Sequence, residues 1–487
     1  MKYTRSRVLI YGILALLIMI VSSMAMVEKL FPKPPQETPP PNTIIVSKDG
    51  EGQHQTIGEA IKSTRPNMRI LVRPGVYKEG LIIDKPIEII GDSKGTDSKT
   101  VIESPGPTCV LMQAENATLR GLTLRGRPGF KAGMFKFFEA RDEGGRPCVD
   151  IARGKLILEN CDITSEAAAS IGVHGYDANA IVRGCKIHDG NSNGIWVTDH
   201  ASATVEDCDI GGMSWAAVRI EDGGNVVLQR CKINNVKNDG VLATNYGTGR
   251  IEGCDILAND LTGVEVRDRS NVTILDSRVS DCKAFGIWFR ENSTGRVESS
   301  EVFRNSGVGI EMMEDSSPTI VKCSVFGNLR SNVEIDRGAD PVIRDCKIHG
   351  GPGSGIFVYE SAKGTIEDCE IFGHQQYQQI VIATGANPTF RRCNVYDGMA
   401  GGVLVQGDAT GTLEDCSIYN NHYAGVGIRE NAGPTIRRCK INRNRGSGIG
   451  IIENGSATVE DSDLTANLGG AWDIQGQAQV RRSRNKE

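Results

Sequence analysis

Apolar residues recur along most of the chain with a period of about 23 positions, and one small residue marks each period. The marker is cysteine in eleven periods and serine in three, and successive markers are 23 or 24 residues apart. Spacing this regular predicts a repeat architecture rather than a set of unrelated domains. The marker positions are Cys161, Cys185, Cys208, Cys231, Cys254, Ser277, Ser300, Cys323, Cys346, Cys369, Cys393, Cys416, Cys439 and Ser462.

Each period contains short runs in which apolar and polar residues alternate. An apolar residue lies three positions before the marker, as at Leu158, and a branched aliphatic residue lies two positions after it, as at Ile163. A further apolar pair follows ten and twelve positions after the marker, as at Ile195 and Val197. The alternation predicts short strands with one buried face. The Asp, Gly or Asn that often precedes the marker predicts a bend between strands.

These strands predict an all-β fold, a single-stranded right-handed parallel β-helix with about 23 residues per coil. One coil cannot bury its apolar face alone, whereas coils stacked about 4.8 Å apart bury that face and pair every strand with parallel neighbours. We expect regular coils over residues 149–483. A short N-terminal capping helix is predicted near residues 56–64, because Thr56 and Glu59 have the spacing of a capping box.

Rows of small polar residues also repeat with the coils. Asn residues five positions after the marker, such as Asn305 and Asn328, predict amides that bond from coil to coil, with a polar ligand-binding row as the alternative. We interpret the marker cysteines as small buried side chains, because parallel neighbours in register have a poor geometry for a disulfide. Neither the cysteines nor the seven histidines have a spacing that indicates a metal cluster.

The composition narrows the function classes. The 58 glycines and the aromatic content of only 5% are typical of many tight turns rather than of a helical bundle. The formal net charge of -5 is small for 487 residues. It gives no electrostatic basis for binding phosphate backbones, so we predict no nucleic-acid partner.

The first 43 residues differ from the repeat. Residues 1–27 are predicted to be a signal-anchor or a signal peptide, because basic residues precede an apolar segment that begins at Val8. Residues 28–43 form a Pro-rich linker, and residues 44–487 form the β-helix. The stiff linker favours an uncleaved membrane anchor. Either arrangement predicts an extracytoplasmic protein, periplasmic or at the cell surface, that is anchored by one transmembrane segment or secreted.

An insertion interrupts the repeat near its beginning. Leu122 occupies the marker position before Cys161, and the 39-residue interval leaves 16 extra residues within 125–147. This segment is rich in Phe, Lys and Arg. It is interpreted either as a lid over a groove or as a packed cover on the rod.

Positions eleven and thirteen should face outward if positions ten and twelve face inward. This outer stripe mixes aromatic rings, guanidinium groups and carboxylates. Aromatic faces suit the apolar faces of sugar rings, and Arg suits uronate carboxylates. The predicted substrate-binding residues are Trp196, Arg219, Arg267, Trp288, Arg290, Phe357 and Tyr359.

A group of acidic residues on this stripe is the candidate for chemistry. Glu311 and Glu334 occupy one register on adjacent coils, with Asp336 beside them. One hypothesis is Ca²⁺ held between the carboxylates. Another is a catalytic pair, to which Glu265 is a further candidate. The alternative without a function is a solvated charged face whose repulsion is relieved by Arg267, Arg290 and Arg337.

Segments near the start of the predicted β-helix resemble the opening of pectin methylesterases, and the later repeats resemble the pectin-lyase-like superfamily, in particular its carbohydrate-binding and sugar-hydrolase repeats. Together the resemblances cover nearly everything after the linker. They imply a right-handed parallel β-helix. The segments similar to the esterases are Ser47 to Gly50, Thr56 to Ile61, Arg73 to Tyr77 and Ile90 to Asp92.

The activities of these relatives do not follow from the resemblance. The esterase motif Gly-Arg-Pro-Trp is absent, since Gly126-Arg127-Pro128 is followed by Gly129 and Gly145-Arg146-Pro147 by Cys148. The Asp-Pro-His signature of alginate epimerases is absent too, because Asp199 is followed directly by His200. Pectin methylesterase activity is therefore not expected.

Three hypotheses for function remain. The first is a non-catalytic module that binds polysaccharide or cell-envelope glycan along the outer stripe, attached to a membrane by its N-terminal segment. The second is a polysaccharide lyase, glycoside hydrolase or epimerase that uses Glu265, Glu311, Glu334 or Asp336. The third is a structural or protein-interaction scaffold. No cofactor is predicted, with Ca²⁺ at the acidic group as the one alternative.

Overall fold

The computed structural model describes residues 41–92, 99–127 and 145–487. Residues 44–487 form one compact unit. The predicted signal-anchor and nearly all of the linker lie outside the described residues, as does most of the insertion. None of the helices within the described ranges has the length and apolar character needed to traverse a lipid bilayer.

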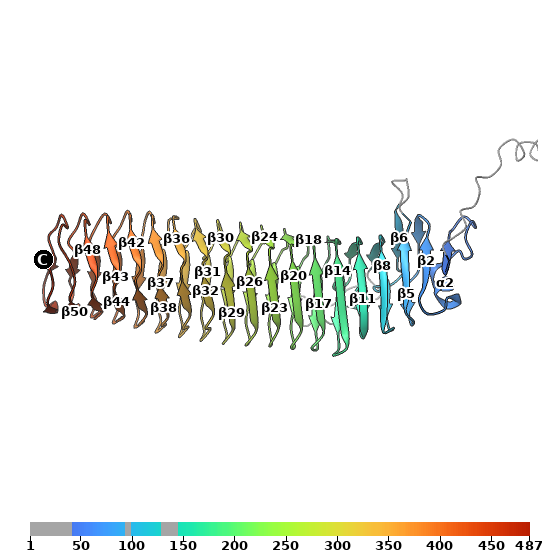
Figure 1. Cartoon of the computed structure of the whole chain (residues 1–487), viewed down its shortest axis with the longest axis horizontal. Helices are drawn as coiled ribbons and strands as arrows, with labels where there is room; N and C mark the ends of the chain where they lie inside the picture. Colours follow the sequence, from blue (N-terminus) through green and yellow to red (C-terminus); the bar gives the residue numbers. More distant parts are fainter. Residues whose placement is uncertain (1–40, 93–98, 128–144) are drawn as a thin grey trace, which may run out of the picture. The chain divides into compact units, whose positions relative to one another are not determined.

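The unit 44–487 is a rod of stacked coils, and most coils contribute one strand to each of three parallel sheets (Figure 1). Sheet A is 19-stranded and consists of β1 (Thr43–Val46), β2 (Met68–Val72), β5 (Ile87–Gly91), β8 (Asn116–Arg120), β11 (Gly154–Glu159), β14 (Ala178–Arg183), β17 (Ser202–Glu206), β20 (Asn225–Gln229), β23 (Thr248–Glu252), β26 (Asn271–Leu275), β29 (Thr294–Glu298), β32 (Thr319–Val321), β35 (Val342–Arg344), β38 (Thr365–Glu367), β41 (Thr389–Arg391), β44 (Thr412–Glu414), β47 (Thr435–Arg437), β50 (Ser456–Glu460) and β52 (Gln479–Ser483).

Sheet B follows the marker position of each coil. It is 16-stranded and consists of β3 (Gly75–Tyr77), β6 (Thr100–Glu103), β9 (Thr123–Gly126), β12 (Asp162–Ser165), β15 (Lys186–His188), β18 (Asp209–Gly211), β21 (Lys232–Asn234), β24 (Asp255–Leu257), β27 (Arg278–Ser280), β30 (Glu301–Phe303), β33 (Ser324–Phe326), β36 (Lys347–His349), β39 (Glu370–Phe372), β42 (Asn394–Tyr396), β45 (Ser417–Tyr419) and β48 (Lys440–Asn442).

Sheet C carries the apolar pair at positions ten and twelve. It consists of β4 (Leu81–Ile83), β7 (Val110–Met112), β10 (Val149–Ile151), β13 (Ile171–His174), β16 (Ile195–Thr198), β19 (Val218–Ile220), β22 (Val241–Ala243), β25 (Val264–Val266), β28 (Ile287–Phe289), β31 (Ile310–Met312), β34 (Val333–Ile335), β37 (Ile356–Val358), β40 (Ile380–Ile382), β43 (Val403–Val405), β46 (Val426–Ile428), β49 (Ile449–Ile451) and β51 (Trp472–Ile474).

The register between coils is the one that the 23-residue period predicts. Ile210 pairs with Ile233 in sheet B, and both side chains are buried. The aliphatic residues of all three sheets form one continuous core inside the rod. The residue before the marker adopts a left-handed conformation even where it is charged, as at Asp207 and Arg230, which confirms the predicted bend. The predicted fold class is therefore confirmed.

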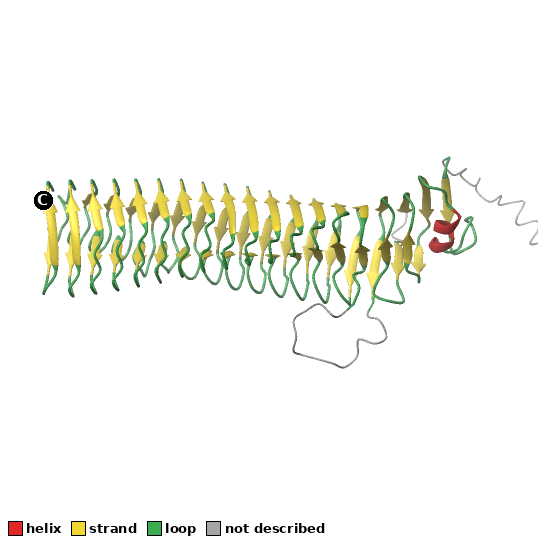
Figure 2. Ribbon diagram, turned by 90° about the horizontal axis from the view of Figure 1, so that it is seen from below, coloured by secondary structure: helices red, strands yellow, loops and turns green. Residues whose placement is uncertain are grey.

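The one α-helix of the described ranges, α2 (Ile57–Ser63), lies at the N-terminal end of the rod against β2 and β4 (Figure 2). Thr56 accepts a hydrogen bond from the backbone N–H of Glu59 at 3.2 Å, as the predicted cap requires. The second contact of a capping box, in which the Glu59 side chain would bond back to the backbone of Thr56, is not the one that caps this helix. The carboxylate of Glu79, from the next turn of the rod, accepts hydrogen bonds from the N–H groups of Ile57 and Gly58.

The Asn row is internal and connects the coils. Asn305 donates to Asn328 at 3.0 Å, and Asn421 donates to Asn444 at the same distance, with all four side chains buried. The structural interpretation of this row is confirmed. The cysteines are also buried, and each marker thiol donates to nearby backbone carbonyls, as Cys208 does to Glu206 at 3.2 Å.

One part of the Asn row is built from other residues. Two coils have glycine at the Asn position, and the side chains of Asn332, His374 and Gln379 complete the row there. Asn332 donates to His374 Nε2 at 2.9 Å, so His374 Nδ1 carries the proton that Gln379 accepts. Burial lowers the pKa of His374 to about 4. Protonation would place an N–H of His374 against the donor group of Asn332.

A ladder of stacked rings runs along the outer face of sheet B, a feature that the sequence analysis missed. Neighbouring ring centroids are 4.9 to 5.0 Å apart. Because the rings stack face to face, the ladder ties adjacent coils together and presents only ring edges to solvent. Its members are Phe303, Phe326, His349, Phe372, Tyr396 and Tyr419.

The buried imidazole predicts a defined loss of stability in acid. The folded pKa of His374, about 4, is below the ordinary value of 6.5, so stability is lost as pH falls from about 6.5 toward 4. Between pH 7 and pH 5 the free energy of unfolding should fall less in His374→Asn than in the wild type, and the difference between the two decreases should be up to about 2 kcal/mol. Denaturant unfolding at the two pH values measures this. An equal loss in both proteins would contradict the role assigned to His374.

Candidate functional site

The outer face of sheet C carries all of the predicted site residues. Along one row, residues on successive coils pair in register from Trp196 on β16 to Phe357 on β37. A second row, two residues further along each chain, lies at or just beyond the strand ends. The first row is Trp196, Arg219, Leu242, Glu265, Trp288, Glu311, Glu334 and Phe357.

This face is more enclosed than an open strand surface. The exposed fraction is 6% for Glu265, 6% for Glu311, 9% for Glu334 and 1% for Asp336. Carboxylates this deeply buried require hydrogen bonds or cations, or they shift their pKa. The partners of each carboxylate therefore decide what it can do.

In the lower part of the site the polar side chains form hydrogen bonds and ion pairs with one another. Trp196 donates its indole N–H to Glu221 at 2.6 Å, and Arg219 donates to the other oxygen of the same carboxylate at 2.8 Å. These contacts bring two of the predicted binding residues, Trp196 and Arg219, together through an acid that was not singled out from the sequence. The arrangement orients both side chains along the face.

The middle part of the site is a second paired group. Arg290 Nε and Arg267 Nη1 lie 3.0 and 3.3 Å from the same oxygen of Glu265. The guanidinium of Arg290 also lies over the ring of Trp288, 4.5 Å from its centroid. Glu265 is thereby neutralised by two cations, and these contacts give it a structural role.

The upper part, here called the acidic cluster, consists of Glu311, Glu334 and Asp336. Glu311 and Glu334 pair in register on β31 and β34, and Asp336 follows β34 on the same face. No described residue forms an ion pair with these three carboxylates. Asp336 Oδ1 is buried without a hydrogen-bond partner.

Burial governs the protonation of the acidic cluster. Burial, with Glu334 and Asp336 acting in the same direction, raises the pKa of Glu311 to about 8. Burial also raises the pKa of Glu334, although hydrogen bonds from Ser331 and the charge of Arg330 oppose the shift. It raises the pKa of Asp336 against the opposing effect of the Tyr359 hydroxyl. Glu311 can therefore hold a proton at neutral pH beside two other carboxyl groups.

The interpretation of these acids as a solvated charged face is wrong. The three side chains are largely buried, and the arginines expected to relieve them are engaged elsewhere. Arg267 and Arg290 bind Glu265, while Arg337 forms ion pairs with Glu314 and Glu360. Arg337 acts on Glu311 and Asp336 only through space.

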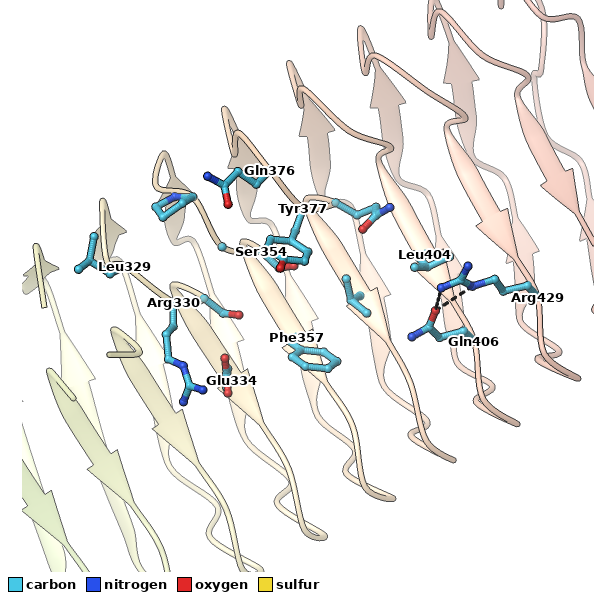
Figure 3. Close-up of a pocket in the computed structure, with 15 residues that line it drawn as sticks. Leu329, Arg330, Glu334, Ser354, Phe357, Gln376, Tyr377, Leu404, Gln406 and Arg429 are labelled. Atoms are coloured by element: carbon cyan, nitrogen blue, oxygen red, sulfur yellow. Dashed lines mark hydrogen bonds between the residues drawn. The ribbon is translucent and has the colours of Figure 1, made fainter. Parts of the chain in front are cut away.

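A groove of about 720 Å³ adjoins the acidic cluster and extends toward the C-terminal coils. Its floor is the outer face of sheet C, including Glu334, Phe357, Val381 and Leu404. One wall is the row of turns that lead from sheet B into sheet C, where Tyr377 is 56% exposed. Figure 3 shows Glu334 and Phe357 side by side on the floor, with Tyr377 on the wall above them.

The lining of the groove is mostly uncharged. Besides Phe357 and Tyr377 it contains amide and hydroxyl side chains, and its only charged residues are Arg330, Glu334 and Arg429. Arg429 donates two hydrogen bonds to Gln406 at 2.9 and 2.6 Å (Figure 3). The amide and hydroxyl residues are Ser331, Ser354, Gln376, Gln378 and Gln406.

The calcium hypothesis finds no support in the geometry. Within the described ranges no three side chains of His, Cys, Asp or Glu are placed to hold a metal ion together, and the acidic cluster is included in that set. Glu311 and Glu334 lie in one row, while Asp336 lies one row away beside Tyr359.

Several residues around the site were missed from the sequence. The wall residues Arg330 and Tyr377 come from turns whose length varies between coils, so no register predicted them. Asp239 lies on such a turn beside Glu265, and burial raises its pKa to about 7. Asp150 on β10 binds His174 on β13 at 2.7 Å. That pair could have been found by extending the outer stripe toward the N-terminus.

Comparison with protein families matches this chain to the right-handed β-helix region. The matched residues are 140–237, 216–354 and 331–486, which together span more than half of the chain.

A probable pectinesterase/pectinesterase inhibitor of Arabidopsis thaliana is 33% identical over 115 residues. The match covers 21% of this chain and only 17% of that relative. A periplasmic alginate epimerase structure aligns over 85% of this chain and 78% of its own, at 10% identity and a TM-score of 0.37. A pectin methylesterase of Aspergillus niger aligns over 54% and 86%, at 15% identity and a TM-score of 0.33.

Replacing Glu311 by Gln should stabilise the protein in mild alkali. Its folded pKa of about 8 is above the ordinary value of 4.5, so stability is lost as pH rises from about 4.5 to 8. Glu311→Gln removes the buried charge and should raise the free energy of unfolding at pH 8 by about 2 kcal/mol or more, with little effect at pH 4.5. Denaturant unfolding at both pH values measures the difference.

Glu265→Gln is the matched control, because Glu265 is as buried as Glu311 but has two arginine partners. It should lower stability by roughly 1–3 kcal/mol, since it leaves Arg267 and Arg290 without their acceptor. Destabilisation of similar size by both variants would show that Glu311 is also paired.

Proposed function

This chain belongs to the family of right-handed β-helix regions, and from that premise we propose that it binds a polysaccharide along the outer face of sheet C. The observation that carries the proposal is the groove of about 720 Å³ beside the acidic cluster. Its volume is within the usual range for ligand sites, and it extends over several coils along the rod. An extended polymer suits a site of this form better than a compact ligand does.

The lining of the groove has the chemistry that sugar rings require. Phe357 and Tyr377 offer aromatic faces for the apolar faces of the rings. The glutamine and serine side chains supply donors and acceptors for hydroxyl groups without introducing charge. The similarity of one segment to a pectinesterase relative agrees with a carbohydrate ligand.

The location we propose is outside the cytoplasm, at the periplasmic or cell surface. Lys2, Arg5 and Arg7 precede the apolar segment that begins at Val8, which is the charge order of a segment that directs the following chain across a membrane. Attachment through this segment would hold the β-helix near cell-envelope glycans. The absence of a nucleic-acid partner remains a prediction from the net charge.

A second function, cleavage or epimerisation of the bound glycan, is favoured by one observation. Glu311 has a pKa of about 8 and lies in register with Glu334 on the adjacent coil. A carboxyl group that keeps its proton beside another carboxyl group is the arrangement used by a general acid and its partner. In that case Glu311 would donate the proton, and Glu334 or Asp336 would act as base or nucleophile.

Binding is tested with a glycan array followed by calorimetry on the oligosaccharides that bind. Phe357→Ala and Tyr377→Ala should each weaken binding about tenfold, because the stacking of an aromatic side chain on a sugar ring contributes roughly 1 kcal/mol or more. Tyr246→Ala, which removes another exposed ring away from the groove, is the control. Unchanged affinity in both groove variants would exclude the groove as the binding site.

Catalysis is tested on the glycans that bind, with assays for reducing ends and for unsaturated uronates. If the chain is an enzyme, Glu311→Gln and Glu334→Gln should each lower the rate by a factor of about 100 or more, and binding should persist. Binding without turnover would leave a non-catalytic module. No binding and no turnover would instead favour a structural or protein-interaction scaffold.

A further inference from the structure

We propose that the acidic cluster is a subsite for a protonated amine, so that the glycan bound in the groove carries amino sugars with free amino groups. The inference rests on the proposed polysaccharide binding and adds the substrate class. It is carried by the lack of an ion pair from any described residue to Glu311, Glu334 and Asp336, and by the aromatic rings that lie on both sides of them.

Three other enclosed glutamates of the rod have arginine partners. Glu265 binds Arg290 at 3.0 Å, Glu367 binds Arg344 at 3.1 Å, and Glu414 binds Arg437 at 2.9 Å. Glu311 and Asp336 are at least as buried as Glu265 and Glu414, and Glu334 is nearly so, yet the three form no ion pair with the described part of the chain. A ligand that brings its own positive charge would complete it in the same way.

Two buried polar atoms at the cluster have no partner. Asp336 is 1% exposed, and its Oδ1 atom accepts no hydrogen bond. The indole N–H of Trp288, on the coil next to Glu311, is buried without an acceptor. The two atoms lie on coils separated by the coil of Glu311, so they would need two different groups of a ligand, an N–H donor at Asp336 and an acceptor such as a hydroxyl at Trp288. An amino sugar has both.

The order of side chains along the outer row also fits a cation. Trp288, Glu311, Glu334 and Phe357 lie on four successive coils, so the two acids are flanked by rings. Phe357 is stacked with Tyr359 at a centroid distance of 4.4 Å. Arg290 lies over the ring of Trp288, so the carboxylates would attract an ammonium group through charge, with Phe357 as the neighbouring ring.

The same charges disfavour a polyuronate. A uronate in the groove would place a carboxylate beside Glu334, the member of the acidic cluster that lines it. Arg429 is held by Gln406 and Glu430, and Arg337 is held by Glu314 and Glu360. Arg330, on the wall next to Glu334, forms no ion pair with the cluster, and its charge acts on Glu311 and Glu334 only through space.

The test compares sugars that differ in one group. Calorimetry at pH 6 with the full β-helix unit in its native chain uses a β-1,4-linked glucosamine oligomer, its fully N-acetylated form and an oligogalacturonate of equal length. The glucosamine oligomer should bind about tenfold or more tightly than either of the others. Equal or tighter binding of the N-acetylated form or of the oligogalacturonate overturns the amine subsite and leaves polysaccharide binding intact. No binding of any oligomer removes both proposals.

Substitutions in the acidic cluster test whether its carboxylates cause the preference for the amine. Glu334→Gln and Asp336→Asn should each reduce the preference for the amine over the N-acetylated oligomer to less than about threefold. Glu370→Gln is the control, because it removes an exposed carboxylate on the outer face of sheet B. A preference that persists in both cluster variants overturns the assignment. Tighter binding of oligolysine than of the glucosamine oligomer also overturns it, in favour of a peptide ligand.

Discussion

Register between successive coils is the constraint on which the rest of this molecule depends. Each strand satisfies its backbone by pairing with the same strand of the next coil, so a residue and its counterpart 23 positions later lie side by side. A shift of one residue would turn the inner face outward and expose the core. The marker cysteines, the Asn row and the ring ladder all hold the same register from different positions around the coil.

Because register is set by the core, it could be predicted from the sequence, and so could the residues that meet on the outer face. The spacing of apolar residues alone places Glu311 beside Glu334 and Trp288 beside Glu311. The capping helix was also predictable from its cap residue and apolar positions. Its second capping partner, Glu79, was not, because that contact depends on how the next turn of the rod lies over the helix.

Burial and pairing of the site could not be predicted in the same way. The period gives no information on the turns that form the wall of the groove, since residues such as Arg330 and Tyr377 belong to segments without strand pairing. Whether an acid has a partner also depends on side-chain reach. Arg267 and Arg290 are one or two coils from Glu311 in the sequence pattern, yet both turn toward Glu265. The charge of the cluster therefore appears only in the folded rod.

A solenoid can carry an unpaired acidic cluster because its stability is distributed along its length. Each coil adds core contacts and backbone pairing with its neighbours. The free-energy cost of burying carboxyl groups on two coils is therefore small beside the stabilisation from the long continuous core. The same chain pairs Glu265, Glu367 and Glu414 with arginines, and the row register would admit an arginine beside Glu311 as well. Buried carboxyl groups without the ion pair that the fold could have supplied are consistent with a ligand that brings a cation of its own. The cost of folding at Glu311 and the affinity of the groove for its ligand then have one physical origin.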